Sequence, residues 1–198
     1  MQADHEFDLP REAATAIIDE GMLTARTSGD PWTRAFCLAF GTMAYGRAPP
    51  PDAEANLQEA ISGARAAGDP WLYAEALACK AMFERRRGAF SASATLSQEA
   101  LAVSRSIDNQ TMVINMLHYL ADCNVGMRDA QKARALAREG IGYCMDSGAR
   151  GALGMFLGTL AGIAMIEGSF AKGGRLITAW ATIVEATEPL SDFRRWSG

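Results

Sequence analysis

The chain has 198 residues, of which 49% are apolar, 21% are charged and 8% are aromatic, and its formal net charge is −4. This length suits one domain, or two small ones, with a sizeable buried core. The composition is too apolar for a disordered chain, and the mildly acidic balance argues against electrostatic binding of nucleic acid.

The composition also favours helices over strands. The chain contains 37 alanines but only four valines, and alanine favours helix whereas valine favours strand. His5 and His118 are the only histidines, which leaves few groups for metal binding or acid–base catalysis. We therefore expect an all-α protein that is not an enzyme and holds no metal and no cofactor.

The sequence gives no sign of secretion or membrane insertion. The acidic start lacks the charged-then-apolar pattern of a signal peptide. The longest uncharged run, residues 151–166, is shorter than the roughly 20 residues that a membrane-spanning helix needs. Four cysteines show no CxxC spacing and are expected to be buried free thiols: Cys37, Cys79, Cys123 and Cys144. These observations predict a cytoplasmic protein.

Turn signals recur along the chain with a period near 40 residues. Ser-Gly-Asp-Pro-Trp at 28–32 recurs as Ala-Gly-Asp-Pro-Trp at 67–71, and polar turns follow at 106–109 and 147–150. A second set of glycines lies about halfway between these turns: Gly46, Gly88, Gly126 and Gly168. This alternation is typical of helix-turn-helix hairpins stacked as an α-solenoid.

The segments between the turns predict about nine helices, hence about four hairpins. Apolar residues recur in them at helical spacing, and Asp30, Asp69, Asp108 and Asp129 are placed to cap helix N-termini. In chain order the predicted helices cover residues 10–27, 31–45, 52–67, 70–87, 90–106, 109–125, 129–147, 150–167 and 169–187. We expect a flexible segment at 1–9, the repeat domain at 10–187 and a tail at 188–198.

The paired helices, the Gly-Asp-Pro-Trp turns and the hairpin turn at 167–170 resemble tetratricopeptide repeats of a roughly 40-residue kind. Residues 160–168, 175–180 and 185–190 resemble the repeat region near the C-terminus of bacterial LuxR-family and related signal-transducing ATPase transcriptional regulators. The resemblance implies a right-handed superhelix that binds a protein or peptide in signal transduction and transcription regulation. The family's phosphate-binding loop and DNA-recognition helix have no counterpart here. Because the first helix matches the second helix of a repeat, we expect the chain to belong to a longer protein.

A polar strip on the helix at 109–125 is the candidate binding groove. Asn115, His118 and Asp122 share one helix face, because their spacing is i, i+3, i+7, and Tyr119 lies beside them. Residues of the helix at 70–87 extend the strip into the preceding repeat: Tyr73, Lys80 and Glu84. The resemblance implies that first helices of the hairpins line a concave groove. An ordinary solvated face explains the strip equally well.

Three further features are interpreted as structural. Gly154, Gly158 and Gly162 lie four residues apart and are expected to form a close-packing seam, with a neighbouring repeat helix favoured over a partner helix. Replacing Gly158 by leucine should then destabilise the fold. Arg85-Arg86-Arg87 suits the C-terminus of a helix. Trp32 and Trp71 occupy equivalent repeat positions, which favours packing between hairpins over ligand stacking.

The expected partner is a protein or peptide, or another domain of a longer parent protein, without direct nucleic-acid or membrane contact. The alternative is a sensor for a small-molecule effector such as a metabolite or sugar. The exposed ends of the solenoid could also pair two copies as a homodimer.

Overall fold

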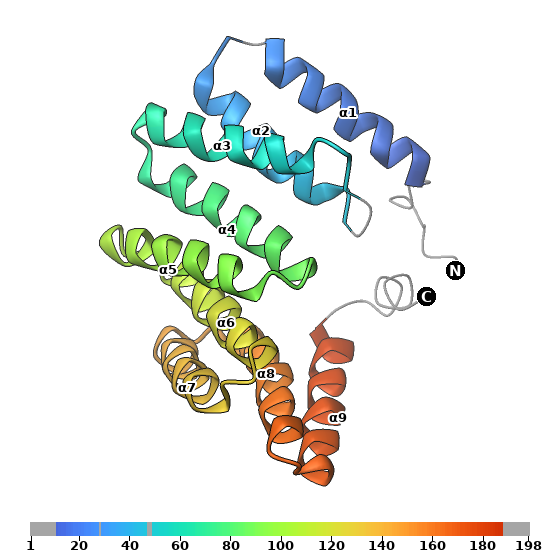
Figure 1. The fold of residues 1–198 in the computed structure, drawn as a ribbon, viewed down its shortest axis with the longest axis vertical. Coiled ribbons are helices and arrows are strands. Elements are labelled where there is room, and N and C mark those ends of the chain that lie inside the picture. Colours follow the sequence, from blue (N-terminus) through green and yellow to red (C-terminus); the bar gives the residue numbers. More distant parts are fainter. Residues whose placement is uncertain (1–10, 28, 47–48, 188–198) are drawn as a thin grey trace, which may run out of the picture. The chain divides into compact units, whose positions relative to one another are not determined.

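Every regular element in the described part of the chain is helical (Figure 1). The computed structural model describes residues 11–27, 29–46 and 49–187, and within them it confirms the all-α helical repeat and the nine predicted α-helices. The predicted flexible segment 1–9 and tail 188–198 lie outside the described residues. The helices are α1 (Arg11–Thr27), α2 (Pro31–Ala44), α3 (Ala53–Ala67), α4 (Pro70–Arg86), α5 (Phe90–Ser106), α6 (Gln110–Gly126), α7 (Ala130–Ser147), α8 (Leu153–Ile166) and α9 (Phe170–Thr187), with a 3₁₀ turn at Arg150–Ala152 before α8.

The turns between helices each place one residue in the left-handed backbone region. Between hairpins these residues are Gly29, Gly68, Asp108 and Gly148. Within hairpins they are Gly46, Gly88, Arg128 and Gly168. Because glycine reaches positive φ without steric cost, it ends a helix and redirects the chain at six of these eight places.

One predicted turn glycine, Gly126, and one predicted cap, Asp108, are displaced from the observed turn and cap residues by two positions and one position. Gly126 ends α6, where an added Cβ would lie 2.6 Å from the ring of Phe90, and Arg128 is the left-handed residue, with φ 63°. Asp108 likewise takes φ 53°, and Asn109 caps α6 by accepting a hydrogen bond from the Met112 amide at 3.1 Å. Gly126 is therefore a close-packing position.

The other predicted caps are confirmed. The carboxylate of Asp30 accepts from the Thr33 amide at 2.9 Å, and that of Asp129 accepts from the Lys132 amide at 3.0 Å. Asp69 accepts from the amides of Trp71 and Leu72. Such caps satisfy amides that the first helical turn leaves without partners.

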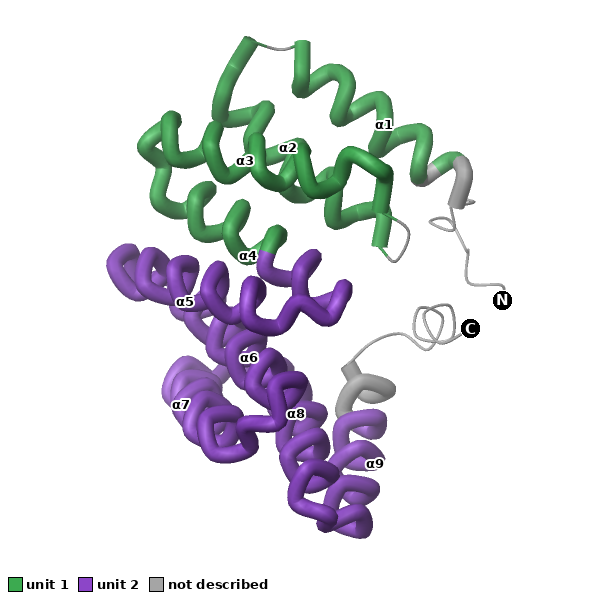
Figure 2. Tube along the Cα trace, viewed as in Figure 1, with its two compact units in different colours: residues 1–80 green, residues 81–198 purple. Residues whose placement is uncertain are grey.

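The chain divides into two compact units, residues 1–80 and 81–198, and the boundary falls inside α4 (Figure 2). In unit 1, α2 packs against α1 and α3, and Leu38, Leu57 and Leu72 are fully buried. In unit 2, α6 packs against α5, α7 and α8, and α8 packs against α9. Its fully buried side chains include those of Met116, Leu117 and Phe156.

None of the helices in the described ranges combines the length and apolar character that crossing a membrane requires. All four cysteines are free thiols, as predicted, and three of them are buried whereas Cys37 is half-buried.

Candidate functional site

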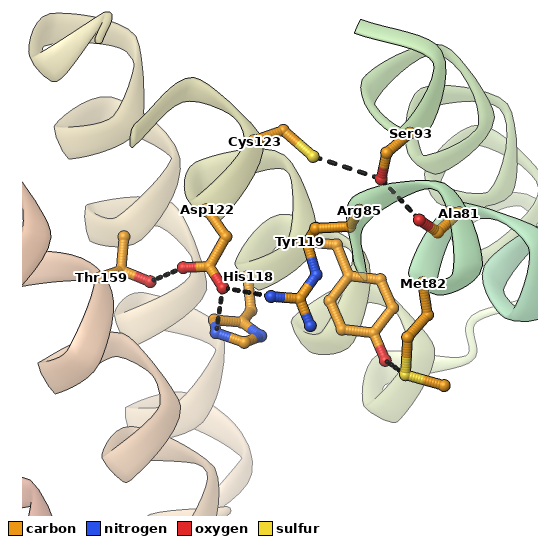
Figure 3. A network of polar contacts seen from close by, with 9 residues as sticks. All are labelled: Ala81, Met82, Arg85, Ser93, His118, Tyr119, Asp122, Cys123 and Thr159. Atoms are coloured by element: carbon orange, nitrogen blue, oxygen red, sulfur yellow. Dashed lines mark hydrogen bonds and ion pairs between the residues drawn. The ribbon is translucent and has the colours of Figure 1, made fainter. Parts of the chain in front are cut away.

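A cluster of polar contacts in unit 2 centres on Asp122 of α6 (Figure 3). One carboxylate oxygen accepts a hydrogen bond from Arg85 Nη1 at 2.9 Å and lies 3.3 Å from His118 Nε2. The other accepts from Thr159 Oγ1 at 2.6 Å. Arg85 lies in the last turn of α4, and Thr159 lies in α8. One carboxylate therefore joins α4, α6 and α8, the first helices of three successive hairpins. We call these four residues the Asp122 cluster.

Two further chains of contacts support the Asp122 cluster (Figure 3). The guanidinium of Arg85 lies over the ring of Tyr119, 5.1 Å from its centroid, and the Tyr119 hydroxyl donates to Met82 Sδ at 3.4 Å. Cys123 Sγ donates to Ser93 Oγ at 3.2 Å, and Ser93 Oγ donates to the Ala81 carbonyl at 2.7 Å. These contacts fix the orientation of α6 against α4 and α5 within unit 2.

His118 is a largely buried titratable group of the Asp122 cluster, with its side chain 13% exposed. Burial lowers its pKa below the ordinary 6.5, although Asp122 raises the pKa and Arg85 lowers it further. The neutral imidazole then holds its proton on Nε2, facing Asp122, since Nδ1 is buried without a hydrogen-bond partner. The ring packs edge-on against Phe156, with centroids 5.7 Å apart. His118 is therefore held as a neutral, oriented ring.

The structure brings together only part of the predicted groove. Asp122, His118 and Tyr119 lie in one contact network with Arg85 and Thr159, which the sequence did not single out as groove residues. Asn115 is half-buried on the same helix, and Glu84 is buried.

The other two groove residues belong to unit 1. Lys80, only 8% exposed, forms an ion pair with Glu54 of α3 at 3.4 Å. The guanidinium of Arg65 lies over the ring of Tyr73 at 4.9 Å and also donates to the Tyr73 hydroxyl. Both predicted residues thus make contacts inside their own unit.

The three glycines of the predicted seam differ in their surroundings. Gly154 is buried, and an added Cβ at Gly162 would lie 2.8 Å from Val125 Cγ1 of α6. Gly158 is exposed and has no atom within 4 Å of that position, so the close packing predicted there is wrong. A close approach that the sequence did not predict lies at Gly140 of α7, where an added Cβ would lie 2.1 Å from Phe156.

An aromatic strip in unit 1 is the feature that sequence reasoning undervalued. Trp32 stacks on Phe36 with centroids 5.3 Å apart and planes 9° apart, and it also lies 6.3 Å from Trp71. Phe36 in turn contacts Phe40 at 4.6 Å. The i, i+4, i+8 spacing of the three α2 residues could have revealed the strip. We call these four residues the aromatic strip.

A carboxylate anchors the aromatic strip. Trp32 Nε1 donates to Asp69 at 2.7 Å, and this bond is the main reason why the pKa of Asp69 lies below its ordinary range. The Trp32 side chain is thereby fixed while 37% of the residue remains exposed. Trp32 and Trp71 do pack between hairpins, as predicted, and Trp32 also remains partly exposed to solvent.

The described residues contain no group of three or more His, Cys, Asp or Glu side chains arranged to hold a metal ion. Searches of protein-family models and of curated proteins find no match to the chain.

Proposed function

We propose that this chain is a non-catalytic scaffold that binds a protein or peptide, and that it serves as the interaction portion of a bacterial regulatory protein in the cytoplasm. The Asp122 cluster supports the non-catalytic part of the proposal. Its carboxylate already accepts hydrogen bonds from Arg85 and Thr159 and lies 3.3 Å from His118 Nε2, so it holds helices together. A general base would need that carboxylate available to a substrate.

The aromatic strip is the observation that carries the binding function. Aromatic side chains, tryptophan above all, are enriched where proteins bind one another, because they bury large apolar areas with little loss of conformational freedom. Trp32 is held in place by Asp69 and by stacking, yet remains partly exposed. A preorganised, exposed ring of this kind loses little entropy when a partner covers it.

Selection of binders from a random peptide library tests the proposal. The full chain should enrich related peptides, and Trp32→Ala should reduce their affinity at least tenfold. Phe170→Ala is the matched control, since Phe170 is 65% exposed and lies in unit 2; it should leave the affinity unchanged. Failure to enrich any peptide, or equal loss in both variants, would overturn the proposal.

The same strip favours one second candidate function, a sugar-sensing domain. Sugars stack their apolar faces on tryptophan rings, and the partly exposed Trp32, which lies beside Trp71, supplies such a ring. A thermal-shift screen with a panel of sugars distinguishes this candidate. A sugar at 100 times its dissociation constant should stabilise the chain by about 2.7 kcal/mol, and Trp32→Ala should abolish that shift.

A further inference from the structure

A second feature of unit 1, separate from the aromatic strip, is an open pocket between α1 and α2. Its volume is about 370 Å³, and its lining is mostly apolar. Gly21 and Ala25 of α1 and Cys37 of α2 form part of its wall, and Glu20 adds a carboxylate. An added Cβ at Gly21 would meet no atom within 4 Å.

Aligning the four repeats shows which residues take the position of Gly21 in the other second helices. The left-handed residues between hairpins, Gly29, Gly68, Asp108 and Gly148, define equivalent positions in the helices that precede them. By this register Gly21 of α1 corresponds to Ala60 of α3, Ala100 of α5 and Gly140 of α7. A small residue therefore occupies this position in all four helices, as expected where another helix packs closely.

Among these four helices, and as far as the described residues show, α1 alone leaves that face open. Gly21 is exposed, whereas its three counterparts are buried. Ile17 is 57% exposed, whereas its α3 counterpart Asn56 is 3% exposed, and the counterparts in α5 and α7 are half-buried. Thr24 is also exposed, whereas its counterparts are half-buried.

On α3 this face is covered by α2, the first helix of the same hairpin, whereas on α7 the atom nearest an added Cβ at Gly140, the counterpart of Gly21, belongs to Phe156 of α8. At Gly63 of α3, the counterpart of Thr24, an added Cβ would lie 3.3 Å from Ala35 Cβ of α2. In unit 2 the first helix α6 packs against both its own second helix, α7, and the next first helix, α8. The α1–α2 pocket lies in the groove that matches α7–α8, and the described residues place no first helix over it.

The charged residues of this face also indicate that a first helix would occupy the pocket. Glu59 of α3 forms an ion pair with Arg34 of α2, the first helix that covers it. Glu20 is the counterpart of Glu59 and lines the pocket, and it makes no ion pair with the described part of the chain. An arginine at the position of Arg34 in a covering helix would complement it.

We propose that the α1–α2 groove binds an amphipathic α-helix of the first-helix type. The helix would lay small and apolar residues over Gly21, Ile17 and Thr24 and would place an arginine beside Glu20. Apolar anchors at helical spacing in a groove are a common mode of helix recognition. Because the aromatic strip plays no part in this inference, the groove and the proposed function can fail separately.

A peptide with the sequence of residues 29–46, which contains α2, is the probe, and one with the sequence of 130–147, a second helix, is the control peptide. We expect the fluorescently labelled probe to bind the full chain one to one and to become helical, while the control peptide binds at least tenfold more weakly. Gly21→Leu should abolish binding by filling the groove. Gly158→Leu is the matched control, since both glycines are exposed and helical with no atom near an added Cβ.

Charge reversal tests the expected orientation. Glu20→Arg should weaken probe binding at least fivefold, and a probe with Arg34→Glu should recover that loss on the variant. Equal binding of both peptides, or probe binding that Gly21→Leu leaves intact, would overturn the proposal. So would self-association of the chain that Gly21→Leu abolishes while the probe does not bind, because the occupant would then be a second copy.

Discussion

At the scale of single residues, His118 makes the stability of the fold depend on pH. Its pKa in the folded chain lies below 6.5, mainly because of burial, whereas the unfolded chain leaves it near 6.5. The unfolded state therefore binds the proton first as the pH falls. The contribution of neutral His118 to the free energy of unfolding is fully present above about pH 7. It declines as the pH falls through 6.5 toward the lower folded-state pKa.

We expect urea denaturation midpoints of the wild type to fall between pH 7.5 and pH 5.5, and His118→Gln to reduce that fall. Protonation would place a positive charge near Arg85 in a buried site, although Asp122 offsets part of this cost. The carboxylates with lowered pKa values, those of Asp30, Asp52 and Asp69, titrate below this window. Parallel pH profiles for the wild type and the variant would contradict the assignment to His118.

Gly140 and Gly142 of α7 distinguish the effect of close packing on stability from the effect of helix propensity. Gly140→Ala would place a Cβ 2.1 Å from Phe156, whose ring is fully buried and has little room to move. We expect a loss of about 1–3 kcal/mol in the free energy of unfolding. Gly142→Ala meets no atom within 4 Å and should gain up to about 1 kcal/mol from helix propensity. Chemical denaturation of both variants measures the free energy of unfolding, which should fall for Gly140→Ala and rise for Gly142→Ala.

At the scale of helices, the Asp122 cluster should contribute more to the free energy of unfolding than an exposed ion pair does. Asp122→Ala removes the carboxylate that accepts hydrogen bonds from Arg85 and Thr159, and both of these hydrogen bonds are part-buried. We expect a cost of about 2–3 kcal/mol in the free energy of unfolding. Glu139→Ala is the control, because its ion pair with Arg105 leaves both side chains more than 40% exposed, and it should cost less than about 1 kcal/mol. Equal costs would contradict the linking role of Asp122.

The helices themselves could be predicted because their boundaries are encoded locally. The predicted ranges differ from the observed ones by at most one residue at each end, apart from the start of α8, which a 3₁₀ turn precedes. A glycine at positive φ or a capping carboxylate marks most turns, and both act within a few residues of themselves. Arg128 was missed because nothing in an arginine signals a left-handed residue.

The contacts between helices could not be predicted in the same way. Asp122 meets Arg85 and Thr159, each 37 residues away in sequence, and this offset depends on how hairpins stack. Helical spacing places Asp122 on a face of α6 but does not show what covers that face. The Gly158 prediction failed for the same reason, since a glycine every fourth residue is compatible with both packed and exposed positions.

At the scale of the whole molecule, the division into two compact units determines how far a local change should spread. In repeat proteins each helix contacts mainly its neighbours, so stability is approximately a sum of local terms. Units 1 and 2 each have their own fully buried side chains, such as Leu57 in the first and Phe156 in the second. A destabilising change in one unit should therefore open that unit before the other.

Hydrogen exchange measured by mass spectrometry tests this local stability with a reciprocal pair of variants. Gly140→Ala should speed exchange in α7 and α8 while α2 and α3 exchange as in the wild type, since its clash with Phe156 lies within unit 2. Leu57→Ala should do the reverse, because it removes a fully buried side chain of unit 1 at a cost of about 2–5 kcal/mol. Local opening free energies report such subglobal units directly. Faster exchange across both units in either variant would instead mean that the chain unfolds as one cooperative unit.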